Sequence, residues 1–430
     1  MLQWSAQPFL GTVLGQIEKI MRLFLLLLTP IPLYCAAQKL TPVWVEAGRN
    51  KLVLARVVVE RGSECPSISI GNAAPVAMHL RQPAPKHFQP ICEFEIPPGT
   101  KRASVENQKL ALPVDNPSRI AVIGDTGCRL KGDRIQACND PAEWPFASVA
   151  AKAAGSKSQL VIHVGDYLYR ESPCPPGDEK QCGGSPSGDN WEAWNADFFT
   201  PARALLAAAP WAFSRGNHES CSRSWMGWYY YLDPRPFPET CSDYSEPYLV
   251  TLGTFQLLMV DSSAAKDPAD PAQVARYTAL LKPFASTNAW LVEHHPMWGL
   301  QKGARAAAPD APLLAVMQQA YDGAGFAHIG LILAGHQHLF EILSYTNGRP
   351  PQIVAGDAGT MLADQIRKDL KGETVFGTTV ETGQSRHQFG FTFLERKRQY
   401  WEVELKGPSG KVAATCRIEG KAVHCKGSPQ

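Results

Sequence analysis

The 430-residue sequence predicts an α/β fold preceded by a small all-β domain, and three observations lead to this expectation. Between residues 38 and 115, apolar and polar residues alternate with period two between prolines and glycines, as in short strands. From residue 116 to residue 430, strand-like apolar runs alternate with alanine-rich helical stretches, which favours parallel strands joined by right-handed crossovers. The chain is also too long for one ordinary core.

The N-terminal segment, residues 1–37, has the features of an extension and a signal peptide. Met21 opens the stretch MRLFLLLLTPIPLYCAAQ, a basic start followed by an apolar run and small residues, which predicts cleavage near Ala37 and a secreted or periplasmic protein. The run is shorter than the roughly 20 residues of a membrane-spanning helix, so we expect no transmembrane span in the mature chain. Residues 1–20 are either a long n-region or an upstream extension, and a lipid anchor on Cys35 is a weaker alternative.

The cysteines support export, because the ten that follow Cys35 fall into consecutive near pairs. Such an arrangement favours five local disulfides formed in an oxidising compartment. The pairs are Cys65 with Cys92, Cys128 with Cys138, Cys174 with Cys182, Cys221 with Cys241, and Cys416 with Cys425. The alternative is reduced cysteines with a thiolate metal site, but no C-x-x-C spacing occurs. Sequence alone does not fix the connectivity.

The charge composition gives no electrostatic reason to expect nucleic acid as a partner. Charged residues make up 19% of the chain, apolar residues make up 44%, and the formal net charge is +2. This balance is typical of a globular protein.

The second domain contains six apolar runs that predict strands, with helical stretches between some of them. The runs are residues 119–124, 159–165, 211–216, 255–261, 289–296 and 331–338, the helical stretches are 146–155, 191–209 and 311–323, and closing strands are expected from residue 389 on. Two loops stand out: residues 172–190 are rich in proline, glycine and polar side chains, and residues 221–241 are rich in aromatic side chains. Each loop carries one cysteine pair, which favours an ordered rim.

Side chains able to bind metal follow five of these six runs, four of them with a glycine just before the polar residue. They are Asp125 in GDTG, Asp166 and Tyr169 in GDYLY, Asn217 and His218 in GNHE, His294 in EHHP, and His336 and His338 in GHQH. The carboxyl ends of neighbouring parallel strands lie at one edge of a sheet, so these side chains are expected to meet there.

The types of these side chains indicate the metal chemistry. Two aspartates, a phenol, an amide and three imidazoles form an oxygen and nitrogen set that suits iron, zinc or manganese. Seven ligands are too many for one tetrahedral zinc, whereas two metals sharing a bridging carboxylate would use them all. Tyrosine ordinarily ionises near pH ~10, so a bound phenolate implies a strong Lewis acid, with ferric iron the best candidate. The positive charge of the two metal ions that these ligands leave uncompensated would attract an anion such as phosphate.

The five blocks GDTG, GDYLY, GNHE, H-x-P and GHQH, in this order, resemble those of the calcineurin-like metallophosphoesterases over roughly residues 119–341. Tyr169, with Gly127 where other branches carry a histidine, is similar to the purple acid phosphatases. The resemblance implies a four-layer α/β/β/α metallophosphoesterase sandwich behind a fibronectin-like β domain. It also implies Fe(III) with a divalent ion (Fe, Zn or Mn). Asp125, Tyr169 and His338 would hold the first ion, Asn217, His294 and His336 would hold the second, Asp166 would bridge them, and His218 would protonate the leaving group or hold substrate.

The function expected from these features is an exported binuclear phosphoesterase in which a metal hydroxide attacks a small phosphate ester, with acid phosphatase activity foremost. A phosphodiesterase or nucleotidase on the same core is an alternative, and so is a phosphate-binding or phospholipid-binding surface protein without turnover. Purple acid phosphatases often continue past the last histidine with a tyrosine, a glutamate and an arginine, whereas Leu339, Phe340 and Glu341 follow here. The resemblance therefore leaves open which residues contact the substrate.

Several of these residues also have ordinary structural interpretations. Taken singly, Asp125 or Asn217 could cap a helix and Tyr169 could be a packed aromatic residue. His295 is expected either to bind substrate or to support a neighbouring ligand. Three further features are expected to be structural: His163 as a hydrogen-bonded core residue, Asp261 as a cap, and the aromatic residues of 225–231 as rim packing.

Overall fold

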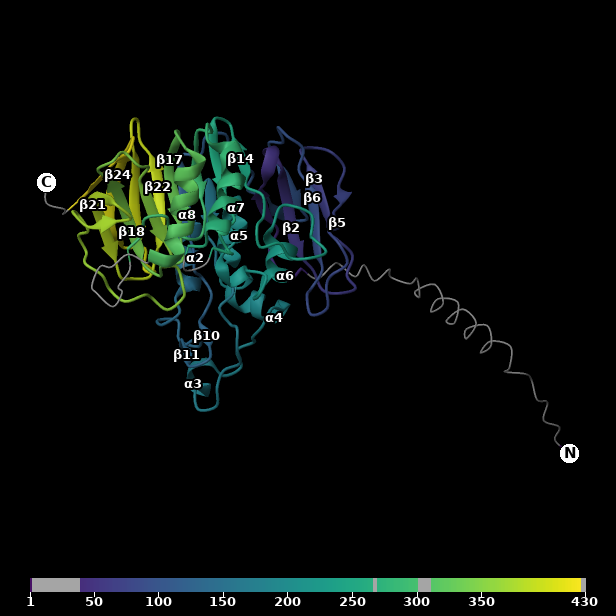
Figure 1. Ribbon diagram of the computed structural model, residues 1–430. Helices are drawn as coiled ribbons and strands as arrows, with labels where there is room; N and C mark the ends of the chain where they lie inside the picture. The colour runs from purple at the N-terminus through teal and green to yellow at the C-terminus, as the bar shows by residue number, and fades with distance from the viewer. Residues whose placement is uncertain (2–38, 266–268, 301–310, 427–430) are drawn as a thin grey trace. The chain divides into compact units, whose positions relative to one another are not determined.

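A computed structural model describes residue 1 and residues 39–265, 269–300 and 311–426 of the chain (Figure 1). The predicted signal segment and its cleavage site near Ala37 lie outside the described residues, apart from Met1. Ala37–Gln430 forms one compact unit. None of the described helices has both the length and the apolar character needed to cross a membrane.

Two large sheets form the centre of this unit, and the sequence order of their strands shows the crossovers. The first sheet has the order β25 (Ala422–Cys425), β24 (Val412–Glu419), β23 (Trp401–Lys406), β22 (Phe391–Arg396), β9 (Arg119–Ile123), β12 (Leu160–His163), β13 (Trp211–Phe213), β1 (Trp44–Ala47), β2 (Val53–Val58), β6 (Ile91–Glu95), β5 (His79–Leu80). The second has the order β14 (Tyr248–Leu252), β15 (Phe255–Met259), β16 (Ala289–Val292), β17 (Ile329–Ala334), β19 (Gln352–Ala355), β18 (Phe340–Tyr345), β21 (Thr378–Arg386), β20 (Thr374–Val375).

The two sheets pack face to face because apolar side chains point to both sides of their central strands. In β9, Ile120 and Val122 lie in a core shared with Leu257 of β15, whereas Ile123 belongs to a separate core on the opposite face. Leu258, the next residue of β15, packs on the outer side of the second sheet. Continuous apolar runs are what strands buried on both faces require.

Helices cover the two outer faces, which gives four layers. The first sheet is covered by α2 (Phe146–Gly155), α4 (Trp191–Trp194), the π-helical turn η2 (Asn195–Phe199) and α5 (Arg203–Ala208), and the second by α7 (Pro271–Leu281) and α8 (Ala311–Ala324). Short turns complete the helical elements: η1 (Arg49–Lys51), α3 (Glu179–Cys182), η3 (Asn217–Glu219), α6 (Trp225–Gly227), η4 (Trp228–Leu232) and η5 (Lys282–Phe284).

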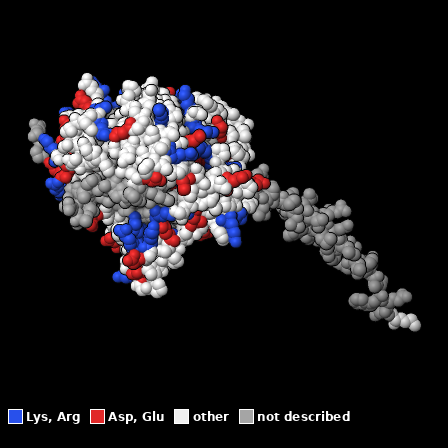
Figure 2. Space-filling model, in the orientation of Figure 1, with Lys and Arg blue, Asp and Glu red and all other residues white. Residues whose placement is uncertain are grey.

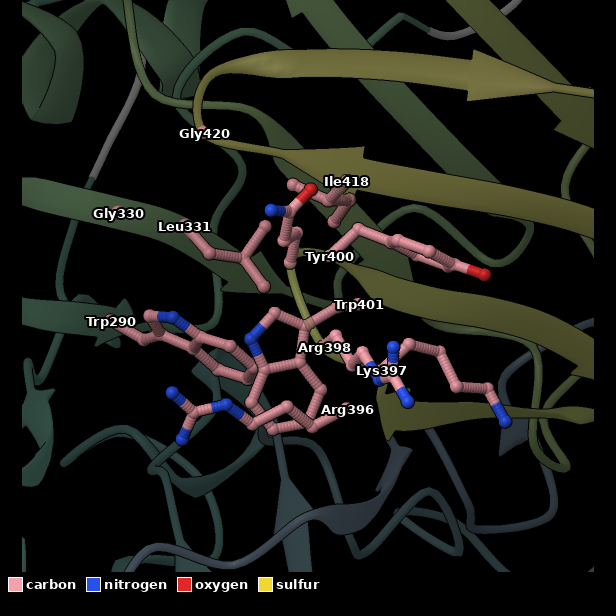
Figure 3. Close-up of a pocket in the computed structure, with 11 residues that line it drawn as sticks. Trp290, Gly330, Leu331, Arg396, Lys397, Arg398, Tyr400, Trp401, Ile418 and Gly420 are labelled. Carbon is pink, nitrogen blue, oxygen red and sulfur yellow. The ribbon is translucent and has the colours of Figure 1, made fainter.

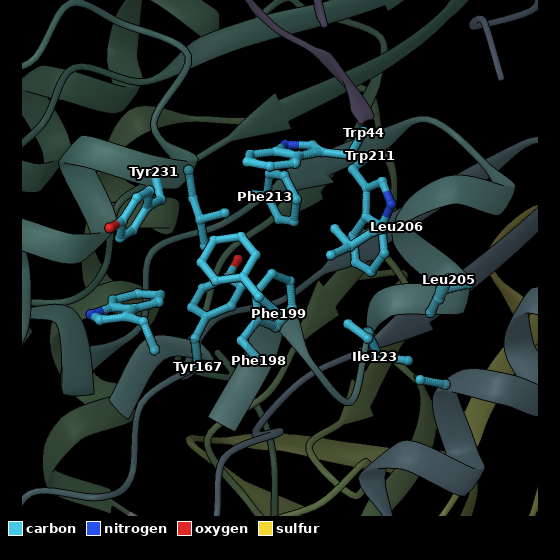
Figure 4. Close-up of a cluster of buried hydrophobic side chains, with 14 of the residues drawn as sticks. Trp44, Ile123, Tyr167, Phe198, Phe199, Leu205, Leu206, Trp211, Phe213 and Tyr231 are labelled. Carbon is cyan, nitrogen blue, oxygen red and sulfur yellow. The ribbon is translucent and has the colours of Figure 1, made fainter. Parts of the chain in front are cut away.

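An aromatic core lies between the first sheet and its helices (Figure 4). Phe198 is fully buried and meets the Tyr167 ring edge-on at 5.2 Å between ring centroids. Trp228 and the three tyrosines that follow it are also buried in this core. These residues were expected at the rim of a loop, but their large apolar area places most of them inside.

The N-terminal strands extend the first sheet, because Glu46 of β1 pairs with Trp211 of β13 in parallel. A separate four-stranded sheet packs on their other face; its order is β4 (Val76–Ala77), β3 (Ser67–Ile70), β7 (Ala103–Val105), β8 (Gln108–Lys109). Residues 44–109 therefore form strands and one short turn, as a β domain would. The boundary near residue 115 stays a prediction, since the first sheet runs continuously across it.

All five predicted cysteine pairs form disulfides. Cys128 with Cys138 and Cys174 with Cys182 hold a projection, seen at the bottom of Figure 1, that contains β10 (Leu130–Lys131), β11 (Arg134–Ile135) and α3. Figure 2 shows acidic and basic side chains interspersed over the face in view, with a group of basic side chains on this projection. Crosslinks in loops of this kind restrict the unfolded chain.

Candidate metal centre

The predicted ligands meet because five parallel strands end at one edge of the paired sheets. β9, β12 and β13 pair in parallel in the first sheet, and β16 and β17 pair in parallel in the second. Their carboxyl ends are followed by Asp125, Asp166, Asn217, His294 and His336 respectively. Two further side chains, Tyr169 and His338, come from the turns that follow β12 and β17.

The Tyr169 hydroxyl is the meeting point of one half of the centre. It lies 2.7 Å from Oδ1 of Asp125, 2.8 Å from Oδ2 of Asp166 and 3.0 Å from Nε2 of His338. One hydroxyl proton can serve only one of these acceptors. One phenol proton does not compensate the negative charge of two buried carboxylates, so a cation bound here would stabilise them.

The other half of the centre is built around Asn217 and Asp166. Nε2 of His294 lies 3.1 Å from Oδ2 of Asp166 and 3.0 Å from Oδ1 of Asn217. Nδ1 of His336 lies 3.0 Å from the same amide oxygen. Ligand atoms of Asp166, His294 and His336 all lie within 4.8 Å of one another. Through Oδ2, the Asp166 carboxylate therefore contacts both halves.

Two of the imidazoles have their outer nitrogens fixed by backbone carbonyls. Nδ1 of His294 lies 2.9 Å from the carbonyl oxygen of Val164, and Nδ1 of His338 lies 2.8 Å from that of Met361. An N–H that donates to each carbonyl leaves the Nε2 lone pair facing the centre, which is the tautomer that a metal ligand needs. The donor set and its orientation thus fit metal ions bound by oxygen and nitrogen.

Burial and neighbouring charges set the protonation of the two central oxygen donors. Burial would raise the pKa of Asp166, but His294 and His218 outweigh it and hold that pKa well below its usual range. Burial, with the carboxylates of Asp125 and Asp166, raises the pKa of Tyr169 well above its usual value. A bound cation acts in the opposite direction on a phenol, because it favours the phenolate.

Three of the predicted ligands have left-handed backbone conformations. The φ angles are +54° at Asp125, +61° at Asp166 and +70° at His336. Such conformations are uncommon for residues with a side chain and persist where the surroundings enforce them. They turn each side chain back over the end of its strand, which is how short turns deliver ligands to one point.

Gly216 is required by the close approach of the Asn217 turn to the bridging residue. A Cβ at this position would overlap both the backbone nitrogen and Oδ1 of Asp166. We expect Gly216→Ala to displace Asp166 and to weaken metal binding by at least about tenfold, by analogy with losses of supporting contacts around metal sites. Metal titration by calorimetry would measure the loss.

Gly155→Ala is the matched control for this substitution. Gly155 ends helix α2, and an added Cβ would meet nothing within 4 Å. This variant should bind metal like the parent chain. Equal metal affinity in the Gly216→Ala variant would contradict the close-approach argument.

Two carboxylates that the sequence did not single out hold the ligand turns in place. Glu219 accepts hydrogen bonds from the backbone N–H groups of Asp166, Tyr167, Leu168 and Gly216 at 2.9–3.2 Å. Asp197, on the turn η2, accepts from the N–H groups of Cys128, Tyr169 and Arg170 at 2.8–3.1 Å. The only signal for Glu219 in the sequence is its place at the end of the GNHE block, and Asp197 lies outside all five blocks.

The side chain of His218 lies against the centre, and its backbone N–H donates to Oδ1 of Asp166 at 2.8 Å. Its ring contacts that of Tyr169 in a tilted arrangement, with 3.7 Å between the ring centroids, and Nε2 is 3.8 Å from Oδ2 of Asp166. Nδ1 faces Glu171 at 2.8 Å and the carbonyl of Leu168 at 3.1 Å. Burial is the main cause that lowers the pKa of His218 to about 4.

His295 occupies the border of a cavity next to the centre. It lines a space of about 500 Å³ together with Asn217 and Arg223, and its Nδ1 is 3.2 Å from Oγ of Ser262. Ser262 Oγ also accepts from the backbone nitrogens of His294 and His295. The structure therefore places His295 between a supporting contact and an open space, and both predicted roles remain compatible with its position.

Two remaining expectations have different outcomes. His163 is buried, with Nε2 3.2 Å from Oγ1 of Thr126 and its ring stacked on Tyr167, as expected for a core histidine. Asp261 does not cap a helix; its carboxylate pairs with Arg215 at 3.0 Å and accepts from the nitrogen of Ser263. The Asp261 carboxylate therefore forms a charge-assisted hydrogen bond with the buried guanidinium of Arg215.

A second hollow of about 270 Å³ opens at the opposite edge of the sheets (Figure 3). Trp290 of the second sheet and Trp401 of the first line it and meet edge-on at 4.9 Å. Arg396 to Arg398, in the turn between β22 and β23, line its rim. None of the predicted site residues lines this hollow, so it is separate from the metal centre.

Comparisons with known proteins agree with this arrangement. A family model described as calcineurin-like phosphoesterase matches residues 118–340, more than half of the chain. Purple acid phosphatase from yellow lupin (Lupinus luteus) seeds aligns over 89% of this chain and 74% of its own, with a TM-score of 0.54 and 12% identity. The structure of PhoD aligns over 93% and 94%, with a TM-score of 0.60 and 11% identity. No curated protein matches the sequence. The structural likeness confirms the predicted four-layer fold.

Proposed function

The chain belongs to the calcineurin-like phosphoesterase family, and from this premise we propose that it is an exported hydrolase of small phosphate esters, with the activity of a purple acid phosphatase. The observation that carries the proposal is the convergence of seven oxygen and nitrogen side chains, with the Asp166 carboxylate in contact with both halves of the set. Tyr169 supports the purple acid phosphatase type, because its hydroxyl lies at the centre. Gly127 supports it as well: a Cβ there would lie 2.5 Å from the carbonyl oxygen of Tyr167, which leaves no space for a histidine.

The residues divide into two ligand groups that share Asp166. Asp125, Tyr169 and His338 would hold a ferric ion, and Asn217, His294 and His336 would hold a divalent iron, zinc or manganese ion. When bound, two such ions would orient a phosphoryl group, supply a hydroxide near neutral pH and stabilise the charge of an in-line displacement. A phenol among the ligands favours the ferric ion in the first group.

The side chains around these ligands would handle the proton and the substrate. His218 presents Nε2 toward the centre, while Glu171 and the carbonyl of Leu168 face Nδ1. In the imidazolium form both ring nitrogens carry a proton, and the proton on Nε2 can then pass to the departing oxygen. His295 would contact the part of the ester that enters the adjoining cavity. Five disulfides support export to an oxidising compartment.

Metal analysis and turnover measured on the same sample test this proposal. We expect the purified protein to contain iron and a second metal, to be violet because of phenolate-to-iron charge transfer, and to hydrolyse a chromogenic phosphomonoester. Removal of metal by a chelator should abolish both the colour and the turnover. Active protein that contains neither iron nor a second metal would contradict the proposed centre, and metal-loaded protein without turnover would favour a binding protein.

A further inference from the structure

The substrate contacts that the resemblance leaves open have a candidate in the structure, the side chain of Arg129. Its exposed fraction is 8%, and it comes from the segment that follows the GDTG turn. Its guanidinium carbon lies 4.9 Å from the centre of the Tyr169 ring. Its Nη2 is 3.5 Å from Nε2 of His338, so the guanidinium faces the ligand atoms.

In the described part of the chain, no carboxylate pairs with this buried guanidinium. Among the described residues, none of the ion pairs within 4.0 Å involves Arg129, and its Nε has no hydrogen-bond partner. Burying an unpaired charge is costly, because the interior replaces water poorly unless an anion is present. Arginine has five donors in a planar fork that fits two oxygens of one anion.

The backbone of Arg129 is held firmly on the same frame as a metal ligand. Oε1 of Gln136 accepts from the nitrogen of Arg129 at 3.0 Å and from the nitrogen of Met361 at 2.9 Å. The carbonyl of Met361 in turn orients His338. The Cys128 disulfide closes the loop that contains Arg129. This fixed position suits a residue that orients a bound group rather than one that only covers the surface.

Arg223, on the other side of the centre, provides the contrast. Its Nη2 lies 2.8 Å from both ring nitrogens of His218, but it also pairs with the Glu171 carboxylate. Lys131 approaches the other oxygen of Glu171 at 3.2 Å. Arg223 therefore has a carboxylate partner, which it shares with Lys131, whereas no carboxylate of the described residues pairs with Arg129.

We propose that Arg129 binds a phosphate oxygen of the substrate and makes the centre select doubly charged phosphomonoesters over singly charged phosphodiesters. This inference rests on the proposed function and specifies its substrate class. A phosphomonoester carries close to two negative charges at neutral pH and has three free oxygens. A diester carries one charge, and its second organic group replaces an oxygen that the arginine fork would grasp.

The test compares Arg129→Ala and Arg129→Lys with Arg134→Ala, whose residue is exposed on the same hairpin and whose loss changes the net charge equally. For each metal-loaded protein, kcat/KM is measured with 4-nitrophenyl phosphate and with bis(4-nitrophenyl) phosphate. The affinity for orthophosphate is measured by calorimetry and the metal content by elemental analysis. We expect Arg129→Ala to lower kcat/KM for the monoester and the affinity for orthophosphate by about 10- to 100-fold, and kcat/KM for the diester by less than about threefold. Arg134→Ala should change none of these values.

Equal losses for both esters, or unchanged orthophosphate affinity at normal metal content, would overturn the assignment. If Arg129→Ala fails to fold or to load metal, Arg129→Lys decides the matter: it should bind orthophosphate more weakly and retain a smaller preference for the monoester, and parent-like values would overturn the assignment. A parent protein that hydrolyses neither ester would refute the proposed function instead. The orthophosphate affinities of the parent protein and the Arg129 variants would then still test whether Arg129 binds phosphate.

Discussion

Asp166→Asn is expected to lower phosphomonoester turnover by more than about a thousandfold, well beyond the 10- to 100-fold typical for partners outside the ligand set. Oδ2 of Asp166 approaches both the Tyr169 hydroxyl and the His294 imidazole, at 2.8 and 3.1 Å. An amide at this position removes the negative charge that two neighbouring cations would share. It also presents N–H donors to one of these partners. Both metal positions should weaken together, which elemental analysis after dialysis would show as the loss of two ions rather than one.

Asp133→Asn makes the matched control for this loss, because Asp133 is exposed in the turn between β10 and β11 and the charge change is the same. It should leave turnover and metal content unchanged. Retention of one metal in Asp166→Asn, with the other lost, would show that Asp166 belongs to a single ion. Retained turnover would exclude it from the reaction.

The fold was predictable where apolar runs mark strands that are buried on both faces. Residues 119–124 predicted a strand, and β9 spans Arg119–Ile123; residues 331–338 predicted one, and β17 spans Ile329–Ala334. The helical stretch 191–209 is instead divided into α4, the π-helical turn η2 and α5. Asp197 lies in η2 and accepts a hydrogen bond from the backbone N–H of Tyr169. The periodicity of a segment does not encode a contact of this kind between residues far apart in the sequence.

The convergence of the predicted ligands was predictable for a different reason. Their residue types and the glycine turns are local features of the sequence, and parallel pairing brings the strand ends together. The residues that support these ligands were not predictable. Arg129 and Asp197 lie in stretches without a motif, and their importance comes only from burial and from partners distant in sequence. The pairing of Cys128 with Cys138 could be predicted, but not that the loop which this disulfide closes carries a buried guanidinium beside Tyr169.

Asp197→Ala is expected to lower the free energy of unfolding by about 3–5 kcal/mol, the range found when one partner of a buried ion pair is removed. Oδ1 of Asp197 lies 2.6 Å from Nε of Arg170, and the side chains are 0% and 5% exposed. The substitution leaves that guanidinium buried and deprives three backbone N–H groups of their acceptor. Chemical denaturation would measure the loss. By comparison, Glu395→Ala breaks an ion pair with Lys397 in which both side chains are accessible to solvent, and it should lower the free energy of unfolding far less.

A second variant separates the stranded charge from the lost hydrogen bonds. The double variant Asp197→Ala with Arg170→Leu removes both charges of this ion pair. The three backbone N–H groups still lack their acceptor. If the unpaired guanidinium is the main cost, the double variant should be more stable than Asp197→Ala alone, although two residues have been changed. A double variant as unstable as the single one would assign the cost to the backbone of the Tyr169 turn. The carboxylate of Asp197 would then act chiefly as a positioning group for that ligand, and the loss of stability should be accompanied by a parallel loss of metal affinity.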